Sequence, residues 1–229
     1  YLDMRSKRMR CNILMRHTCN QFIREWFSKN EYIEVETPLL TKSTPEGARD
    51  FLVPSRNQPG KFYALPQSPQ QYKQLLQIGC IERYFQLVRN MRDEDQRGDR
   101  QAEFSQIDVE ASFITQEDIL RMSEEFLVSL VKKIFPEKHF TLLPFPRISY
   151  DDALKRYETD KPDLRKNKDD LNELAAVWIL DFPMFEKMKD GSICATHHPF
   201  TAIKESCIAH FETSPLHSVY AQQYDLSLN

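Results

Sequence analysis

The stretch YFQLVRNMRDEDQRGDRQAEFSQIDVEASF, residues 84–113, predicts two alternating β-strands joined by a strongly charged loop. Side chains alternate between the two faces of a strand, so positions of the same parity share a face. Most odd positions are apolar: Phe85, Leu87, Met91, Ile107, Val109, Ala111 and Phe113. The even positions carry mainly amides and charges: Gln86, Asn90, Arg92, Glu94, Gln106, Asp108 and Glu110. A solvated outer face would also alternate, but so many planar hydrogen-bonding groups favour a face that binds a polar ligand.

Upstream of this hairpin the sequence predicts a helix, a strand and a second helix. Apolar residues recur at helical spacing over residues 5–29, and EYIEVETPLL then alternates until Pro38, which cannot donate to a sheet ladder. Residues 41–60 contain several Pro and Gly and predict a loop or short hairpin, which KFYALP follows as a short strand. Ser68 is a preferred N-cap and Pro69 a preferred first helical residue, so QQYKQLLQIG is predicted to be helical.

Downstream, helices alternate with short strands. Thr115 is expected to cap a helix that runs to about residue 135, and Ser149 a shorter one, with Asp152 three residues on in a capping-box-like arrangement. The charged stretch DKPDLRKNKDDLNE, residues 160–173, predicts a linker or exposed turn, after which VWILDFPMF and SICATHHPF resume as strands. Long helices between hairpin-like strands predict an α+β fold with a largely antiparallel sheet.

Composition excludes several classes of protein. With 31 basic and 34 acidic residues the net charge is −3, so any contact with nucleic acid must come from a local basic patch. The five cysteines are scattered and form no CxxC pair, which argues against a disulfide framework or zinc site and favours a reducing compartment. No apolar run approaches the roughly 18 residues of a membrane span, and no signal peptide precedes the first helix.

Two constellations in and beside the hairpin suit a nucleotide or a nucleic acid. Arg92 and Glu94 are two residues apart on the same predicted strand face, and a cationic fork beside a carboxylate suits a phosphate next to an amine. An in-plane salt bridge is the alternative. Arg97 and Arg100 in the loop DQRGDRQAE could grip a phosphate backbone, although charged hairpin loops are usually only solvated.

Two further segments suit the charged groups of an amino acid. The helix that begins near Ser68 offers free backbone N–H groups, and Gln70 and Lys73 share a face of its first turns, so together they could form a carboxylate pocket. Glu46 and Arg49 lie in TPEGARD, a loop that could close over a ligand and bring a carboxylate to an ammonium group. The alternatives are a capped surface helix with a solvated lysine, and an ordinary turn.

The adjacent histidines His197 and His198 precede Pro199. Neighbouring residues on a strand point to opposite faces, so the two are poor joint metal ligands, and Cys194 and Cys207 do not give zinc spacing. One histidine is therefore expected to face a site and the other to pack.

These segments together resemble the catalytic domain of bacterial-type aspartyl-tRNA synthetases, which have the class II fold. EYIEVETPLL resembles motif 1, in which the proline at the place of Pro38 supports the dimer interface. STPEGARDFLVPSR resembles the flipping loop, YALPQSPQQYKQLL the amino-acid-binding segment and NMRDEDQRGDRQAEFSQIDVE motif 2. PRISYDDALKRY, TDKPDLR, DFPMFE and HHPFTAIKE follow in family order, so the resemblance covers nearly the whole chain.

The resemblance implies a fold and a domain organisation. The fold would be α+β, with an antiparallel sheet of the class II type flanked by helices. Residues 1–159 would be the catalytic core with motifs 1 and 2, and residues 160–177 a linker where bacterial relatives carry an inserted domain. Residues 178–229 would continue the core and be cut before motif 3.

The resemblance also implies roles for single residues. Aspartate would be bound by Glu46, Gln70, Lys73, Arg92, Asp108 and His197. ATP would be bound by Arg92, Asp93, Glu94, Gln101 and Asp225, with Asp225 also at the magnesium ion. Lys73 would pair with the side-chain carboxylate of aspartate, Glu46 would take its ammonium group, and Arg92, the catalytic residue, would bind the α-phosphate. Arg97 and Arg100 would meet the acceptor end of the tRNA.

The implied activity is that of an aspartate–tRNA ligase, a cytoplasmic homodimer without a membrane partner that uses ATP, Mg²⁺, L-aspartate and tRNA(Asp). The nearest alternative is an asparaginyl-tRNA synthetase or an asparagine-forming paralogue that needs no tRNA. Lys73 favours aspartate, because a site that selects an acid over its amide needs a cation. A non-catalytic synthetase-like binding module is a further alternative, and the presence of Arg92, Glu94 and Lys73 argues against it.

The chain departs from the family pattern at both ends. It starts at Tyr1 without a methionine or the family's anticodon-binding domain, and it stops at Asn229 inside a strand-like run, before motif 3. Motif 3 would supply a second ATP-binding arginine and an arginine partner for Lys73. We therefore expect that the parent protein is longer and that this 229-residue polypeptide alone is inactive.

Overall fold

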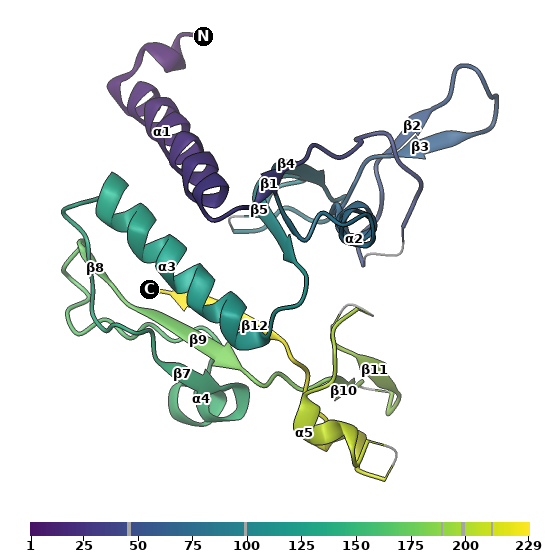
Figure 1. The fold of residues 1–229 in the computed structure, drawn as a ribbon, viewed down its shortest axis with the longest axis vertical. Helices are drawn as coiled ribbons and strands as arrows, with labels where there is room; N and C mark the ends of the chain where they lie inside the picture. Colours follow the sequence, from purple (N-terminus) through teal and green to yellow (C-terminus); the bar gives the residue numbers. More distant parts are fainter. Residues whose placement is uncertain (45–46, 99, 189, 198–199, 212) are drawn as a thin grey trace. The chain divides into compact units, whose positions relative to one another are not determined.

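The computed structural model describes residues 1–44, 47–98, 100–188, 190–197, 200–211 and 213–229. They form two compact units, Tyr1–Thr115 and Gln116–Asn229, and each unit has its own sheets and helices (Figure 1). Within the described residues no helix is both long enough and apolar enough to cross a membrane.

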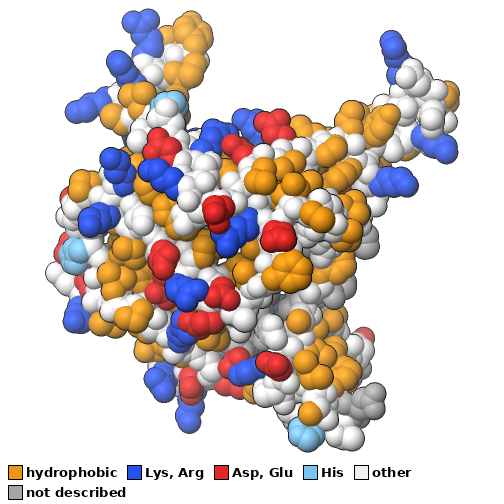
Figure 2. Space-filling view, in the orientation of Figure 1, with side chains coloured by type: hydrophobic (Ala, Val, Ile, Leu, Met, Phe, Trp, Pro, Cys, Tyr) orange, Lys and Arg blue, Asp and Glu red, His pale blue; other side chains and the backbone are white. Residues whose placement is uncertain are grey.

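The first unit is built around the predicted hairpin. Its elements are η1 (Asp3–Arg5), α1 (Lys7–Lys29), β1 (Ile33–Glu34), β2 (Leu52–Pro54), β3 (Phe62–Ala64), α2 (Gln70–Ile78), β4 (Arg83–Met91) and β5 (Glu103–Ala111). Strands β4 and β5 pair antiparallel along their whole length, and β1 pairs parallel to β4 on its other side. Strands β2 and β3 form a separate antiparallel hairpin that projects from the unit in Figure 1, and Lys and Arg side chains gather on this projection in Figure 2.

Helix α1 covers the odd face of β4. Ile23 and Phe27 are the buried residues of α1, and the ring of Phe27 stacks on that of Phe85 with the centroids 4.9 Å apart. Burial of aromatic and aliphatic side chains of this size stabilises a fold by roughly 1.5–3 kcal/mol each. Phe85 itself is fully buried, so this apolar position of β4 packs inward as the alternation predicted. Ile107 and Phe113, at later odd positions, are 39 % and 93 % exposed, so the prediction of one apolar face does not hold for the whole hairpin.

The first two α-helices begin near serines, and the start of the second is shifted by one residue from the prediction. Ser6 caps α1, and its Oγ accepts a hydrogen bond from the N–H of Met9 at 3.2 Å. Helix α2 begins at Gln70, so Pro69 occupies the N-cap position rather than the first helical position that was predicted for it. The Oγ of Ser68 still accepts from the N–H of Gln70 at 3.3 Å, one residue earlier than an N-cap side chain would.

The predicted strand EYIEVETPLL is shorter than expected. Only Ile33–Glu34 forms β1, and the N–H of Val35 adds one further bond to the carbonyl of Phe85 at 3.2 Å. The chain leaves the sheet after this bond, ahead of Pro38, which itself has no N–H for a ladder. Pro38 and the two leucines that follow it are exposed.

The second unit is built on the three-stranded sheet β12-β9-β7, in which β9 pairs antiparallel with β12 and parallel with β7. Its elements are α3 (Gln116–Ile134), β6 (His139–Phe140), β7 (Arg147–Ser149), α4 (Tyr150–Tyr157), β8 (Glu173–Leu174), β9 (Ala176–Leu180), β10 (Phe185–Lys187), β11 (Ile193–Ala195), α5 (Glu205–Ile208), η2 (Leu216–Ser218) and β12 (Tyr224–Leu228). The helices predicted after Thr115 and Ser149 are confirmed as α3 and α4, and Ser149 Oγ accepts from the N–H of Asp152 at 3.2 Å.

Strand β9 is the core of this unit, because both of its faces are buried between α3 and α4 (Figure 1). Trp178 packs with Leu120 of α3, and Ile179 on the other face packs with Ala153 of α4. A strand that is buried on both faces reads as a continuous apolar run, which explains why VWIL shows no alternation. The indole N–H of Trp178 donates to Glu124 Oε1 at 2.8 Å, so its polar group is satisfied inside the core.

One buried carboxylate fixes the charged stretch that precedes β9. Glu173 in β8 is 5 % exposed and accepts from the N–H groups of Lys166 and Asn167 at 2.8 and 2.7 Å. Its Oε1 also accepts from Thr141 Oγ1 at 2.7 Å, and this bond, with the two backbone bonds, holds the pKa of Glu173 below its usual value. Glu173 therefore belongs to the folded unit, and the role of residues 160–177 as the place of an inserted domain stays a prediction.

We expect the substitution Glu173→Gln to destabilise the protein above about pH 5 and to matter progressively less as the pH falls. The pKa of Glu173 is lower in the folded protein than in the unfolded chain, so its ionised form stabilises the fold above the unfolded-state pKa. This stability is lost as the pH falls through the folded-state pKa. Urea unfolding between about pH 3 and pH 7 measures the effect, with the exposed Glu137→Gln as control. A difference that stays constant with pH would contradict the assignment.

Candidate active site

The polar face of β4 is buried, whereas on β5 Asp108 and Glu110 are half-buried and Gln106 is exposed. Gln86 lies opposite Asp108 in the cross-strand register. Tyr84, Gln86 and Asn90 are 0 %, 6 % and 0 % exposed, and the amide of Asn90 donates to Gln106 Oε1 at 2.5 Å. Helix α2 packs against both strands on this side. A solvated outer face is therefore the wrong interpretation for β4, and the polar groups point into the unit.

Lys73 is the centre of this buried face. It is the buried residue of α2, and its ammonium group donates to Asp108 Oδ1 at 2.9 Å and lies 3.2 Å from Glu110 Oε2. An unpaired charge is costly inside a protein, so the burial of this ammonium depends on the two carboxylates. The alternative of a solvated surface lysine is therefore wrong. Gln70 lies one turn earlier, at the first position of the same helix.

Glu110 is a contact of Lys73 to which sequence reasoning gave no role. It lies two residues after Asp108 on the same strand, and this shared parity is the signal that could have indicated it. One ammonium group thus faces two carboxylates, and its contact to Glu110 is the longer of the two. A ligand carboxylate that displaces this contact could pair with Lys73 without adding a third carboxylate around it.

Tyr84 and Gln86 tie this cluster to the segment after β1. The Gln86 amide is best assigned with its nitrogen donating to the Tyr84 hydroxyl at 2.7 Å and to Thr37 Oγ1 at 3.0 Å. Its oxygen then accepts from the N–H of Thr37 at 3.3 Å, so both ends of the amide are satisfied. The Tyr84 hydroxyl is left to donate to Asp108. Burial, together with the Asp108 carboxylate, raises the pKa of Tyr84, so the hydroxyl keeps its proton.

Arg92 lies just beyond β4, which ends at Met91. Its backbone N–H donates to the carbonyl of Ala102 at 2.8 Å, which continues the hairpin by one bond. Its Nε donates to the carbonyl of Gln67 at 3.3 Å, and its guanidinium carbon lies 5.2 Å from the ring centroid of Phe104. No carboxylate among the described residues pairs with it. The two terminal amino groups can therefore make a bidentate contact with a phosphate or a carboxylate.

Arg92 and Glu94 do not share a strand face, and this prediction was wrong. The strand has already ended, and Asp93 forms an isolated bridge with Arg49, whose carbonyl accepts from the N–H of Asp93 at 3.0 Å. The N–H of Glu94 donates to the carbonyl of Arg92 at 3.0 Å, which forms a tight turn. After this turn the side chains no longer alternate between the two faces of a strand. Glu94 and Gln101 are both exposed.

Gln67 is a second residue that sequence reasoning missed. It is 1 % exposed, accepts from the N–H of Ala48 at 3.1 Å and donates to the carbonyl of Ala48 at 2.9 Å. Its amide also donates to Asp50 Oδ1 at 2.5 Å. Gln67 thus fixes the end of the predicted closing loop beside Arg92. The predicted ammonium-binding residue Glu46 lies outside the described residues.

The predicted tRNA-contacting arginines lie at the exposed tip of the β4–β5 loop. Arg97 and Arg100 form an isolated bridge in which the N–H of Arg100 donates to the carbonyl of Arg97 at 3.0 Å. Gly98 between them has φ +58°, a left-handed conformation that glycine adopts readily. Neither arginine forms an ion pair with a residue that the structure describes, so both charges face solvent.

Two predicted site residues lie in the second unit. His197 Nε2 is buried without a hydrogen-bond partner among the described residues, and its ring meets Phe182 edge-on at 5.9 Å. Asp225 in β12 is exposed and accepts from Gln223 Nε2 at 3.2 Å. His198 lies outside the described residues. In the described part of the chain no three His, Cys, Asp or Glu residues come together as a metal site.

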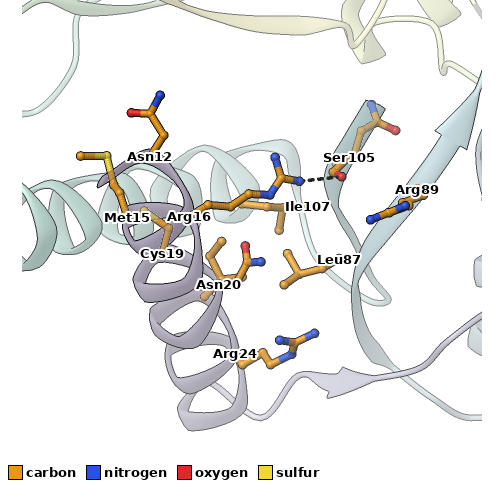
Figure 3. Close-up of a pocket in the computed structure, with 12 residues that line it drawn as sticks. Asn12, Met15, Arg16, Cys19, Asn20, Arg24, Leu87, Arg89, Ser105 and Ile107 are labelled. Carbon is orange, nitrogen blue, oxygen red and sulfur yellow. Dashed lines mark hydrogen bonds between the residues drawn. The ribbon is translucent and has the colours of Figure 1, made fainter. Parts of the chain in front are cut away.

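A cavity of about 640 Å³ lies on the opposite face of the hairpin, between α1 and the odd positions of β4 and β5 (Figure 3). Leu87, Arg89 and Ile107 line it from the strands. Arg16 on α1 reaches across it and donates to Ser105 Oγ at 2.8 Å. None of the predicted site residues that the structure describes lines this cavity, so the sheet separates it from the buried polar face of β4.

Comparisons with known proteins identify a family and several relatives. The family model of class II tRNA synthetases (D, K and N) matches residues 1–229. The aspartate–tRNA(Asp/Asn) ligase of Rubrobacter xylanophilus is 56 % identical over 165 residues, which cover 72 % of this chain and 27 % of that protein. The aspartate–tRNA ligase of Halalkalibacterium halodurans is 49 % identical over 194 residues, covering 84 % of this chain and 32 % of that protein. The chain thus spans less than two thirds of the length of these relatives.

Solved structures share the fold at lower identity. The asparaginyl-tRNA synthetase of Pyrococcus horikoshii complexed with asparaginyl-adenylate has a TM-score of 0.66 at 23 % identity, over 97 % of this chain and 52 % of that one. The asparaginyl-tRNA synthetase of Entamoeba histolytica has a TM-score of 0.71 at 20 % identity, over 98 % of this chain and 52 % of that one. These two likenesses concern the fold alone. Since the family model matches from the first residue to the last, the chain belongs to the class II tRNA synthetases of the D, K and N group.

Proposed function

We propose that the protein containing this chain is an aspartate–tRNA ligase, which activates L-aspartate with ATP and transfers it to tRNA(Asp). The observation that carries the proposal is the buried ammonium group of Lys73, which Asp108 holds at 2.9 Å on the polar face of the hairpin. A cation fixed in this way attracts a carboxylate side chain much more strongly than an amide. The aspartate ligases among the relatives support the same substrate.

The reaction would proceed in two steps without a protein nucleophile. The α-carboxylate of aspartate attacks the α-phosphorus of ATP, a new P–O bond forms, and the bond to the departing pyrophosphate breaks. The terminal ribose hydroxyl of the tRNA then attacks the carbonyl carbon of the aspartyl-adenylate, loses its proton and displaces AMP. Negative charge develops on the α-phosphate in the first step, and the guanidinium group of Arg92 would stabilise it.

Aspartate would be recognised through its side-chain carboxylate and its ammonium group. Lys73 would hold the side-chain carboxylate, with Gln70 beside it on the first turns of α2, and would release its longer contact to Glu110 as the ligand enters. Glu46 would bind the ammonium group once its loop closes. His197 would contact the same ligand through Nε2, the buried atom that lacks a hydrogen-bond partner in the described residues.

ATP would be held by Arg92, Asp93, Glu94, Gln101 and Asp225. Asp225 is an exposed carboxylate that belongs to no group of three or more His, Cys, Asp or Glu residues among the described residues. This fits Mg²⁺, which usually keeps several water molecules and binds through one or two carboxylates together with substrate phosphates. The ion would arrive with ATP and neutralise phosphate charge.

The tRNA and a second subunit would use exposed parts of the first unit. Arg97 and Arg100 would contact the acceptor end of the tRNA. The exposed apolar residues Pro38, Leu39 and Leu40, with Ile13 and Leu14 on α1, would pack against a second copy. We propose a homodimer that works in the cytoplasm.

The decisive experiment is ATP–pyrophosphate exchange by the full-length protein with aspartate or asparagine as substrate. We expect aspartate to support exchange with kcat/KM at least about a thousandfold higher than asparagine, because the amide cannot pair with Lys73. Charging of tRNA(Asp) should follow in the presence of tRNA. Preference for asparagine would assign the protein to the asparaginyl enzymes, and exchange with neither amino acid would favour a non-catalytic module.

A further inference from the structure

The β2–β3 hairpin carries positive charge that has no partner in the described chain. Arg56 and Lys61 lie at its turn, both are exposed, and neither forms an ion pair with a residue that the structure describes. Residues 51–81 contain no Asp or Glu, although the whole chain has a net charge of −3. Figure 2 shows Lys and Arg side chains at the end of this projection and no acidic side chain on its visible face. The hairpin is thus a local basic patch.

Exposed aromatic side chains lie next to these cations. Phe62 is 56 % exposed and Tyr63 44 % exposed, although both lie within strand β3. Phe62 is paired with Pro54 and Tyr63 with Val53, so the two rings stand on opposite faces of the hairpin. Large apolar rings beside unpaired cations are the combination that binds single-stranded nucleic acid, because the rings stack on bases while the cations neutralise phosphates.

The hairpin is joined to the candidate active site by a short, ordered piece of chain. Its turn is closed by a hydrogen bond from the N–H of Ser55 to the carbonyl of Lys61 at 2.9 Å. Beyond β3 the carbonyl of Gln67 accepts from Arg92 at 3.3 Å, in the site itself. The chain between Lys61 and Gln67 spans at most about 20 Å when extended. A strand of only a few nucleotides could therefore lie along the hairpin and reach Arg92.

We propose that the β2–β3 hairpin holds the unpaired 3′ end of the tRNA as it enters the active site. This inference rests on the proposed function, since only a tRNA substrate must bring a single-stranded end to Arg92. Arg56 and Lys61 bind phosphates, and Phe62 and Tyr63 stack on unpaired bases. Every base offers a face for stacking, so the hairpin contributes affinity and positioning rather than the choice of tRNA.

The test compares the double variant Arg56→Gln/Lys61→Gln with the matched control Lys132→Gln/Lys133→Gln in the full-length protein. The control removes the same charge from exposed positions of α3. Binding of fluorescently labelled tRNA(Asp) is titrated at several salt concentrations. We expect the hairpin variant to bind tRNA about tenfold more weakly at low salt. The plot of the logarithm of the binding constant against the logarithm of the salt concentration should be shallower by about 1.4, the value for two lost phosphate contacts to a single strand. Phe62→Ala should weaken binding about fivefold or more, and the control by less than about twofold.

Aspartate-dependent ATP–pyrophosphate exchange without tRNA separates this inference from the proposed function. Unchanged exchange with weakened tRNA binding supports the inference. If the wild-type protein shows no exchange, the proposed function fails, whereas the salt slope of tRNA binding still tests the hairpin. If the hairpin variant binds tRNA with unchanged affinity and unchanged salt slope, the inference is overturned. A changed oligomeric state in that case assigns the hairpin to a protein contact. If the hairpin variant loses both tRNA binding and ATP–pyrophosphate exchange, this also counts against the inference, because the hairpin would then support the fold.

Discussion

The substitution Lys73→Met is expected to lower kcat/KM for aspartate in ATP–pyrophosphate exchange by about a thousandfold or more. Methionine keeps an unbranched side chain, one atom shorter than that of lysine, and removes the charge. Lys73 is the buried cation of the polar face, and Asp108 and Glu110 already surround it with negative charge. Without the ammonium group, an incoming carboxylate would meet two carboxylates at close range, and repulsion would replace attraction.

The preference between substrates is the sharper measurement for this variant. Asparagine does not need the cation, so its much lower kcat/KM should change far less than that of aspartate, and the selectivity should nearly vanish. Lys132→Met, at an exposed position of α3, is the matched control and should keep both values within about twofold. An aspartate preference that survives Lys73→Met would show that another group selects the side chain.

Loss of the fold must be distinguished from loss of recognition. Lys73→Met leaves Asp108 and Glu110 without their cation, and breaking a buried ion pair in this way costs about 3–5 kcal/mol. The double variant Lys73→Met/Asp108→Asn removes one of the two carboxylate charges and should recover part of this free energy of unfolding, while aspartate activation stays low. If activity returns together with stability, Lys73 acts only through the fold.

Much of the framework was predictable from the sequence, because local signals and tertiary packing agree there. The alternation in residues 84–113 predicted β4 and β5 and the apolar face that packs on Phe27. Cap residues predicted the starts of α3 and α4. The free N–H groups in the first turn of a helix need an acceptor, and in α4 the hydroxyl oxygen of Ser149 accepts from the N–H of Asp152. The family resemblance placed both Lys73 and Asp108 at the aspartate, but their direct pairing was not predicted, because α2 and β5 are distant in sequence and no local spacing relates them.

The parts that could not be predicted depend on contacts between distant segments. Burial of the even face of β4 results from the packing of α2, whereas alternation alone is equally consistent with a solvated face. The break of the strand before Arg92 results from the bridge between Asp93 and Arg49, which lie far apart in the chain. Gln67 gave no signal either, since one glutamine in a proline-rich segment has no periodicity.

The substitution Arg92→Lys is expected to lower the rate of aspartyl-adenylate formation by about a hundredfold to a thousandfold, although the positive charge is kept. Lysine is a point charge on a flexible stem and cannot reproduce the planar fork of the guanidinium group. In the structure this fork is fixed by the carbonyl of Gln67 and the ring of Phe104, and its two terminal amino groups have no carboxylate partner among the described residues. Two parallel contacts to the α-phosphate would therefore be replaced by one poorly oriented contact.

The split between kcat and KM shows whether Arg92 stabilises the transition state or only binds ATP. Single-turnover measurement of adenylate formation over a range of ATP concentrations should show a large fall in the maximal rate and a smaller rise in the ATP concentration for half-maximal rate. Arg89→Lys is the matched control, because Arg89 lies on the odd face of the same strand, where it pairs with Glu103 at 3.1 Å, and its rate should stay within about twofold. A fall confined to ATP affinity would make Arg92 a binding residue, because charge that develops on the α-phosphate must be stabilised in the maximal rate.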